Sequence, residues 1–230
     1  VAGEGLELGT NFWNPGWHRP SDCFRDLKNV SGEDPWNPQF LKEVAIFKSL
    51  RFMDWDNTNG SMREKWGERP HKSDRKQNPV AYEWMIDLCN RQHADLWVTL
   101  PHRTVTHAIG DRPCDYALRL CLLVKTGVDM GDVDLQPLLD RLARMKPEEL
   151  IAAGGKKSCE PLSSEQKLYV EYSNETWNGM FKQAHYCCDE GEAAGLDKNP
   201  WTAGFRYHAW AAIRVFRAAD LVFGAESPRV

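Results

Sequence analysis

Short apolar segments with strand character alternate with helical segments along this chain, and this alternation restricts the possible folds more than any other feature. Four apolar segments are each followed by a polar loop: residues 6–13, 50–55, 95–102 and 166–173. Apolar residues recur at helical spacing in residues 38–48, 80–92, 116–125, 135–145, 179–191 and 202–223. Neighbouring parallel strands need crossover connections, which are usually helical. The alternation therefore predicts an α/β fold built on a parallel sheet, either open or closed into a barrel.

The size and composition of the chain are compatible with one globular domain. The chain has 230 residues, of which 42% are hydrophobic, so we expect residues 1–230 to share one core. No stretch approaches the roughly 18 to 20 consecutive apolar residues of a membrane span. The 29 basic and 33 acidic residues are spread evenly and give a net charge of −4. This balance argues against nucleic acid or an anionic membrane as the partner.

The seven cysteines of the chain give little sign of a metal site. None of them forms a C-x-x-C pair, which argues against bound zinc. The odd number leaves at least one free thiol, and Cys187 and Cys188 are adjacent. One or two disulfides, or none, are compatible with this pattern. We expect neither a metal nor an organic cofactor.

Polar and aromatic residues follow each predicted strand. Functional groups of parallel α/β folds gather at the carboxyl ends of the strands. The residues at these positions are Asn11, Trp13, Asn14, Asp54, Trp55, Asp56, Asn57, His102, Arg103, Asn174, Glu175 and Trp177. Such a mixture suits a carbohydrate, because sugar hydroxyls need polar partners and the C–H faces stack on aromatic rings. We expect Asn11, Trp13, Asp54, Trp55 and Trp177 to contact a sugar.

Glu175 is the sharpest catalytic candidate. It follows an apolar strand, next to the amide of Asn174 and close to the indole of Trp177. A carboxyl group in such surroundings can protonate a leaving oxygen. The alternative is a glutamate at the N-terminal end of a helix, stabilised there by the helix dipole.

Other strand-end residues have a functional and a structural interpretation. His102 could orient a carboxylate or bind substrate, and it could equally be a partly buried histidine held by a backbone group. Asp54 and Asp56 could supply a second catalytic carboxylate or a cation site, although aspartates in a turn are commonly loop caps. Arg51 lies inside an apolar strand, so its charge must meet a carboxylate or a strand-end carbonyl.

Three strand-end motifs together resemble glycoside hydrolase clan A, and within it the family 5 cellulase-like pattern. The motifs are Leu50-Arg51-Phe52, Leu100-Pro101-His102 and Ser173-Asn174-Glu175, in that order. The stretch from Tyr169 to Asn178 also resembles a group of poorly characterised bacterial proteins labelled as cellulose-binding. The resemblance covers residues 6–180.

This resemblance implies a (β/α)₈ barrel of the TIM type, of which the chain would contain the N-terminal half, about four β/α units. It also implies a retaining hydrolysis of a β-linked polysaccharide, with Glu175 as the acid/base and a second glutamate on strand seven as the nucleophile. By the same pattern Arg51 would bond the nucleophile, Asn174 the sugar 2-hydroxyl, and His102 would line the site. The expected location is extracellular.

The strand that would carry the nucleophile is missing from the four predicted strands. A complete barrel typically takes about 250 residues, and more when its loops are long. A half barrel exposes sheet edges, so we expect the chain to pair with a second copy or to belong to a longer protein.

Two other functions stay open from the sequence. The chain could bind a glycan without cleaving it. Alternatively, Asp54 or Asp56 could be the partner of Glu175 in an inverting site, which needs carboxyl groups about 6.5 to 9.5 Å apart.

Overall fold

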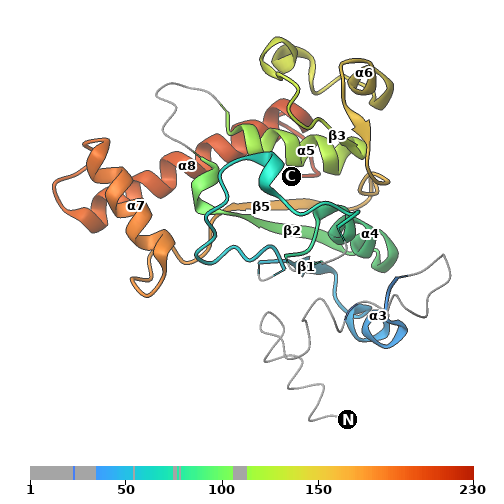
Figure 1. The fold of residues 1–230 in the computed structure, drawn as a ribbon, viewed down its shortest axis with the longest axis horizontal. Coiled ribbons are helices and arrows are strands. Elements are labelled where there is room, and N and C mark those ends of the chain that lie inside the picture. The colour runs from blue at the N-terminus through green and yellow to red at the C-terminus, as the bar shows by residue number, and fades with distance from the viewer. Residues whose placement is uncertain (1–22, 24–34, 54, 75–76, 78, 106–112) are drawn as a thin grey trace.

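A three-stranded parallel sheet lies at the centre of the fold (Figure 1). The structure, a computed structural model, describes residues 23, 35–53, 55–74, 77, 79–105 and 113–230. The strand order is β1 (Ser49–Arg51), β2 (Asp95–Leu100) and β5 (Leu168–Tyr172). The prediction of an α/β fold with a parallel sheet is confirmed, and the described residues contain no closed barrel. The strand expected over residues 6–13 lies outside the described residues.

Six α-helices accompany the strands in the described part of the chain. They are α3 (Pro38–Val44), α4 (Tyr82–Gln92), α5 (Asp115–Thr126), α6 (Pro147–Ala152), α7 (Lys182–Ala193) and α8 (Pro200–Phe223). α3 and α8 begin in the same way, with an asparagine cap followed by a proline. The Asn37 side chain accepts a hydrogen bond from the Gln39 amide, and the Asn199 side chain accepts one from Thr202. These caps satisfy amides that the first helical turn leaves unpaired.

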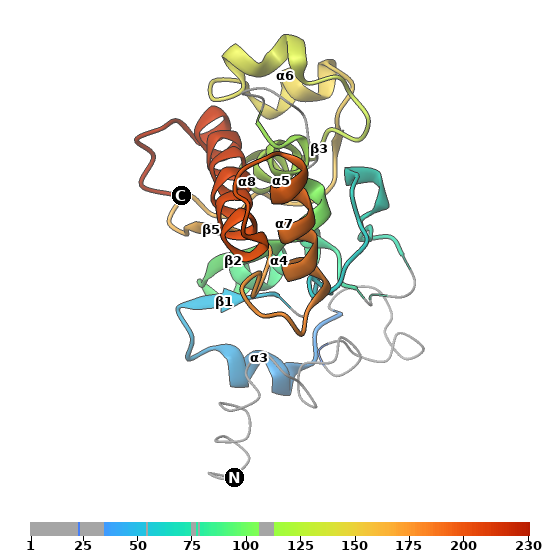
Figure 2. The same ribbon diagram turned by 90° about the vertical axis from the view of Figure 1, so that its left-hand side faces the viewer.

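The two faces of the sheet differ in character. Leu168, Val170 and Tyr172 are buried and alternate along β5 with the partly exposed Tyr169 and Glu171. α8 packs on β5 and also on α5, and Figure 2 shows α5 and α8 together beside β5. The opposite face, which we call the open face, carries Arg51, Trp97, Thr99, Tyr169 and Glu171. Their side chains contact one another across the three strands.

Several predicted elements are shorter in the structure. The strand expected over residues 50–55 ends at Arg51, because the backbone turns there and the Asp56 amide bonds the Phe52 carbonyl. The strand expected over residues 95–102 ends at Leu100, since Pro101 precedes the 3₁₀ turn η2 (His102–Thr104).

The connection between β2 and β5 holds elements that differ from the prediction. The helix expected over residues 135–145 is wrong: a 3₁₀ helix, η3 (Gln136–Arg141), occupies this region. A short antiparallel ladder, β3 (Val128–Asp129) with β4 (Lys156–Lys157), was not expected. All seven cysteines are buried thiols, so the disulfides left open by the sequence are not formed.

A buried ion-pair cluster attaches the long loop after β1 to the rest of the fold. This loop contains the 3₁₀ turn η1 (Trp66–Glu68). The Arg69 guanidinium donates to Glu83 of α4 at 2.9 Å and to Asp129 of β3 at 2.6 Å. Trp66 donates its indole N–H to Asp129 at 2.7 Å, and the Arg69 guanidinium lies over the Trp66 ring. Because every charge in this cluster has an opposite partner, the cluster can remain buried.

α7 and α8 form a closely packed helical hairpin. Gly191 of α7 lies against the backbone of Ala203 in α8, where an added Cβ would be 2.3 Å from the Ala203 oxygen. Gly204 faces Cys188 in a similar way, with an added Cβ 3.0 Å from the sulfur. The absence of side chains at these positions allows the two backbones to approach.

The Gly191→Ala variant should therefore be less stable than the natural chain, by about 1 to 3 kcal/mol, because the helices must separate to admit a methyl group. Urea unfolding followed by circular dichroism would measure this loss. Gly67→Ala is the matched control, since an added Cβ there meets no atom closer than 3.9 Å. Equal stability of the two variants would contradict the packing described.

Candidate functional site

An ion pair between Arg51 and Glu171 lies at the centre of the open face. The Arg51 Nη2 atom is 2.7 Å from the Glu171 Oε2 atom, and Nε donates to the same oxygen at 3.3 Å. The Thr99 hydroxyl also donates to Oε2, at 2.9 Å. These residues come from β1, β2 and β5, so the contact crosses the whole sheet. The carboxylate that Arg51 was expected to need is therefore Glu171.

The same arginine holds the first residue of the predicted Asn-Glu pair. Arg51 Nη2 donates to Asn174 Oδ1 at 3.0 Å, and Asn174 Nδ2 donates to Asn59 Oδ1 at 3.1 Å. Gln183 of α7 donates to Asn59 Oδ1 and to the Asn174 carbonyl, and accepts from the Gly60 amide. The loops after β1 and β5 are thus joined through amide side chains.

The turn after β5 has an unusual backbone. Ser173 and Glu175 both adopt left-handed conformations, with φ of 58° and 43°. Such conformations cost free energy in residues other than glycine and cluster at functional sites. The turn is held from several sides, since Thr176 Oγ1 is 2.9 Å from His208 Nδ1 and Asn178 donates to Glu175 Oε2 at 2.9 Å. The strained turn therefore presents Asn174 and Glu175 in fixed positions.

Glu175 and Trp177 are accessible from this turn. The carboxyl group of Glu175 is partly exposed, and its only described hydrogen-bond partner is Asn178. The Trp177 side chain is 63% exposed, in a turn that also carries the exposed Met180. The turn after β5 thus carries both an accessible carboxyl group and an accessible indole ring.

His102 is buried beside Tyr186. The residue is only 2% exposed, and its ring packs edge-on against Tyr186 with centroids 4.9 Å apart. Its carbonyl accepts the Tyr172 hydroxyl, and its Nδ1 atom has no partner among the described residues. Burial lowers the pKa of His102 to about 4, and the nearby Arg103 cation acts in the same direction.

Trp55 belongs to the core instead of the rim expected from the sequence. It is 7% exposed, and its ring packs against Trp36, Phe40 and Phe52. These contacts cover the ring, so it is not available for stacking on a sugar. Asn11, Trp13 and Asp54 lie outside the described residues.

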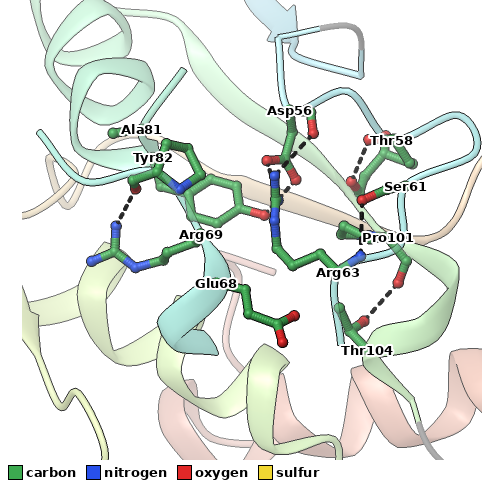
Figure 3. A network of polar contacts seen from close by, with 12 residues as sticks. Asp56, Thr58, Ser61, Arg63, Glu68, Arg69, Ala81, Tyr82, Pro101 and Thr104 are labelled. Atoms are coloured by element: carbon green, nitrogen blue, oxygen red, sulfur yellow. Dashed lines mark hydrogen bonds and ion pairs between the residues drawn. The ribbon is translucent and has the colours of Figure 1, made fainter. Parts of the chain in front are cut away.

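Asp56 is held in a buried network, which Figure 3 shows. Arg63 Nη1 is 2.5 Å from Asp56 Oδ1, and the Tyr82 hydroxyl donates to Oδ2 at 2.6 Å (Figure 3). Tyr116 lies 3.1 Å from the Tyr82 hydroxyl and completes the cluster. Burial raises the pKa of Asp56, whereas Arg63 and Tyr82 oppose the rise. A carboxylate enclosed in this way cannot activate a water for an inverting reaction beside Glu175.

The sequence interpretation missed several residues of the site: Glu171, Thr99, Asn59, Gln183, Thr176 and His208. Glu171 was detectable, because strand alternation places Tyr169 and Glu171 on the face opposite the buried Leu168 and Val170. Gln183 was not detectable from the sequence, since its role depends on the packing of α7 against the loops after β1 and β5.

The described residues contain no group of three or more histidine, cysteine or acidic side chains that could hold a metal ion. Within the same residues, no helix is both long enough and apolar enough to cross a membrane.

The buried His102 should make stability depend on pH. The unfolded chain binds a proton at His102 near pH 6.5, whereas the folded chain resists protonation until about pH 4. Stability is therefore present above pH 6.5 and is lost as the pH falls toward 4, by roughly 2 kcal/mol between pH 7 and pH 5. His208 adds a loss of the same sign, because burial lowers its pKa too.

Urea unfolding at pH 5, 6 and 7 would test this for the natural chain, for His102→Gln and for His185→Gln. His185 is exposed and serves as the control. We expect a smaller loss of stability on acidification in His102→Gln than in the other two proteins. An unchanged pH dependence would show that His102 is not kept neutral by burial.

Comparisons of the chain with models of protein families, with curated proteins and with solved structures found no match. The function has to be inferred from the residues themselves. The described residues at the strand ends offer the ion-paired carboxylate of Glu171, several amide groups, the accessible carboxyl group of Glu175 and the accessible indole ring of Trp177.

Proposed function

We propose that this chain binds a β-linked polysaccharide at the carboxyl ends of β1, β2 and β5, and that Glu175 is the acid/base of a retaining hydrolysis. The observation that carries the proposal is the strained Ser173-Asn174-Glu175 turn. Two left-handed non-glycine positions on either side of Asn174 need compensation from the surrounding structure, and strain of this kind is typical of functional sites. Here the strain fixes the orientation of an amide and a carboxyl group.

The chemistry of the surrounding residues supports a sugar as the ligand. Arg51 and Asn59 supply partly exposed planar polar groups, which pair well with hydroxyls. The exposed Trp177 ring supplies an apolar surface on which the C–H face of a sugar can stack. A sugar needs both kinds of contact, and both are available here.

Glu175 is suited to proton transfer because solvent and ligand can reach its carboxyl group. Asn178 bonds one carboxyl oxygen, Oε2, and so restrains the side chain. The other oxygen, Oε1, is free to face a glycosidic oxygen. Protonation of the leaving oxygen in this way typically contributes about 10² to 10⁴ in rate.

We also propose that the sheet corresponds to three consecutive strands of a (β/α)₈ barrel. In support, β1, β2 and β5 follow one another in space and along the chain, and helices lie in the connections. The open face, with its polar and aromatic residues, would then correspond to the barrel interior. Further strands, from a second copy or from a longer chain, would be needed to close it.

Glycan binding without hydrolysis is the second candidate. The exposed Trp177 and the amide groups favour it, since they can hold a sugar without help from any carboxylate. The two functions differ in what the loss of Glu175 would change.

The test compares hydrolysis of aryl β-glycosides, β-glucans and β-mannans by the natural chain and by Glu175→Gln. We expect Glu175→Gln to lose at least about 10²-fold in rate on the polysaccharides, while its binding in affinity electrophoresis remains. Glu160→Gln is the matched control, because the Glu160 side chain is 86% exposed.

Full activity of Glu175→Gln would overturn the acid/base role. Binding that Trp177→Ala weakens, with no hydrolysis by the natural chain, would establish the second candidate. If the natural chain neither binds nor hydrolyses any of these glycans, both candidate functions are overturned.

A further inference from the structure

We infer that a second copy of this chain docks on the exposed face of α8, with the two α8 helices antiparallel and related by a two-fold axis at Ala209. This inference goes beyond the proposed function and does not rest on it. It rests on three features of α8: a row of exposed apolar side chains, a cavity at the C-terminal end of the helix, and two opposite charges near its ends.

α8 carries a row of exposed apolar residues over about four helical turns. The helix packs against α5, α7 and β5 through its other side. The row, which we call the α8 stripe, consists of Trp201, Phe205, Ala209, Ile213 and Phe216. Its four large side chains are between 41% and 52% exposed. Their spacing of three or four residues places them on one face of the helix, and an exposed apolar face of this kind marks an interaction site.

The α8 stripe is symmetric about its central residue. Phe205 precedes Ala209 by four residues, and Ile213 follows it by four. In an antiparallel pair centred on Ala209, Phe205 of each copy therefore faces Ile213 of the other. The small side chain of Ala209 lies at the crossing point, where two packed helices approach most closely. A two-fold interface needs a surface that complements itself in this way, so a second copy is the partner that suits the stripe.

A cavity of about 350 Å³ lies at the C-terminal end of the α8 stripe, and Phe216 and Asp220 line it together with residues of β5. These two residues follow Ala209 by seven and eleven positions, whereas Trp201 precedes Ala209 by eight. Side chains of a helix lean toward its N-terminus, so Trp201 leans toward the C-terminal end of an antiparallel neighbour. The exposed part of the Trp201 ring therefore lies over the cavity of the other copy.

Two charged residues lie at equal distances from the centre of the stripe. Lys198 precedes Ala209 by eleven residues, Asp220 follows it by eleven, and both side chains are exposed. In the antiparallel pair Lys198 of each copy lies opposite Asp220 of the other, so the two-fold axis creates this ion pair twice. A parallel pair would not bring these charges together. Exposed ion pairs add little affinity, but they select the orientation and register of a complex.

The proposed interface reaches the turn that carries Glu175. Gly179 of this turn lies against the Trp201 ring, because an added Cβ at Gly179 would be 3.1 Å from that ring. A second copy that covers Trp201 therefore contacts the helix end next to the candidate site.

The first experiment measures the mass of the chain in solution by sedimentation velocity over a range of micromolar concentrations. The natural chain should form a species of twice the chain mass of 26.4 kDa. Ala209→Glu should raise the dissociation constant at least about 10-fold, because it brings two carboxylates together at the two-fold axis. Ala193→Glu, the same change at an exposed position of α7, is the matched control and should leave the dimer unchanged.

The second experiment tests the register by charge reversal. Lys198→Glu and Asp220→Lys should each raise the dissociation constant about 3- to 10-fold, because each opposes like charges twice in the dimer. The double variant restores opposite charges, so it should dimerise as the natural chain does. A double variant as weak as the single variants would overturn the proposed register.

The third experiment identifies the surface by crosslinking. In Ala209→Cys the two introduced thiols face each other across the axis, so mild oxidation with copper phenanthroline should join them in a disulfide. The seven natural cysteines are buried and should not compete. Ala193→Cys is the control and should stay uncrosslinked.

The outcomes are independent of glycan binding and hydrolysis, since none of these measurements involves a sugar. A natural chain that is monomeric at every concentration overturns the inference. A dimer that Ala209→Glu does not weaken, or that Ala209→Cys does not crosslink, overturns it too, because another surface then forms the dimer. The substituted side chains are exposed, so the variants should fold, and circular dichroism would verify this.

Discussion

Two buried arginines fix the long loop that follows β1, and the geometry of the candidate site depends on them. Arg63 closes the loop on itself through Asp56, and Arg69 attaches it to α4 and β3 through Glu83 and Asp129. Losing one partner of such a pair typically costs about 3 to 5 kcal/mol, because a buried charge is left uncompensated. Asn59 lies between Asp56 and Arg63 along this loop. The ion pair of these two residues therefore helps to hold Asn59 where it accepts a hydrogen bond from Asn174.

The open face of the sheet combines two properties that seldom occur together. Arg51 and Glu171 neutralise each other, which allows charged groups to lie in the middle of a sheet. The pair remains partly exposed, so its atoms stay accessible. Arg51 also extends the contact to Asn174, and the aromatic Trp97 lies beside the arginine, 5.3 Å from its guanidinium. Polar recognition and apolar contact are therefore available within one small region.

The sequence predicted the parallel α/β architecture, because strand and helix periodicities are local and strong. The same patterns placed Arg51 inside a strand and Asn174 at the end of another, and the structure brings these two residues together. The burial of Trp55 was not predictable, since it depends on Trp36 and Phe40, which precede it by more than a dozen residues. The 3₁₀ helix η3 was mistaken for an α-helix because leucines recur at similar spacing in both. The role of Gln183 arises from tertiary contacts alone.

The close packing of α7 on α8 couples the site to a distant part of the molecule. Gly191 and Gly204 let the two helices approach closely, so we expect α7 and α8 to move as one unit. Gln183, in the first turn of α7, bonds both Asn59 and the backbone of Asn174. A tilt of the hairpin would release both loops together, and a ligand that fixes Asn174 would in turn fix the tilt. A ligand of the outer surface of the hairpin that favours one tilt would change the affinity for a ligand at the strand ends. By thermodynamic linkage, the strand-end ligand would change the affinity for the first ligand by the same factor.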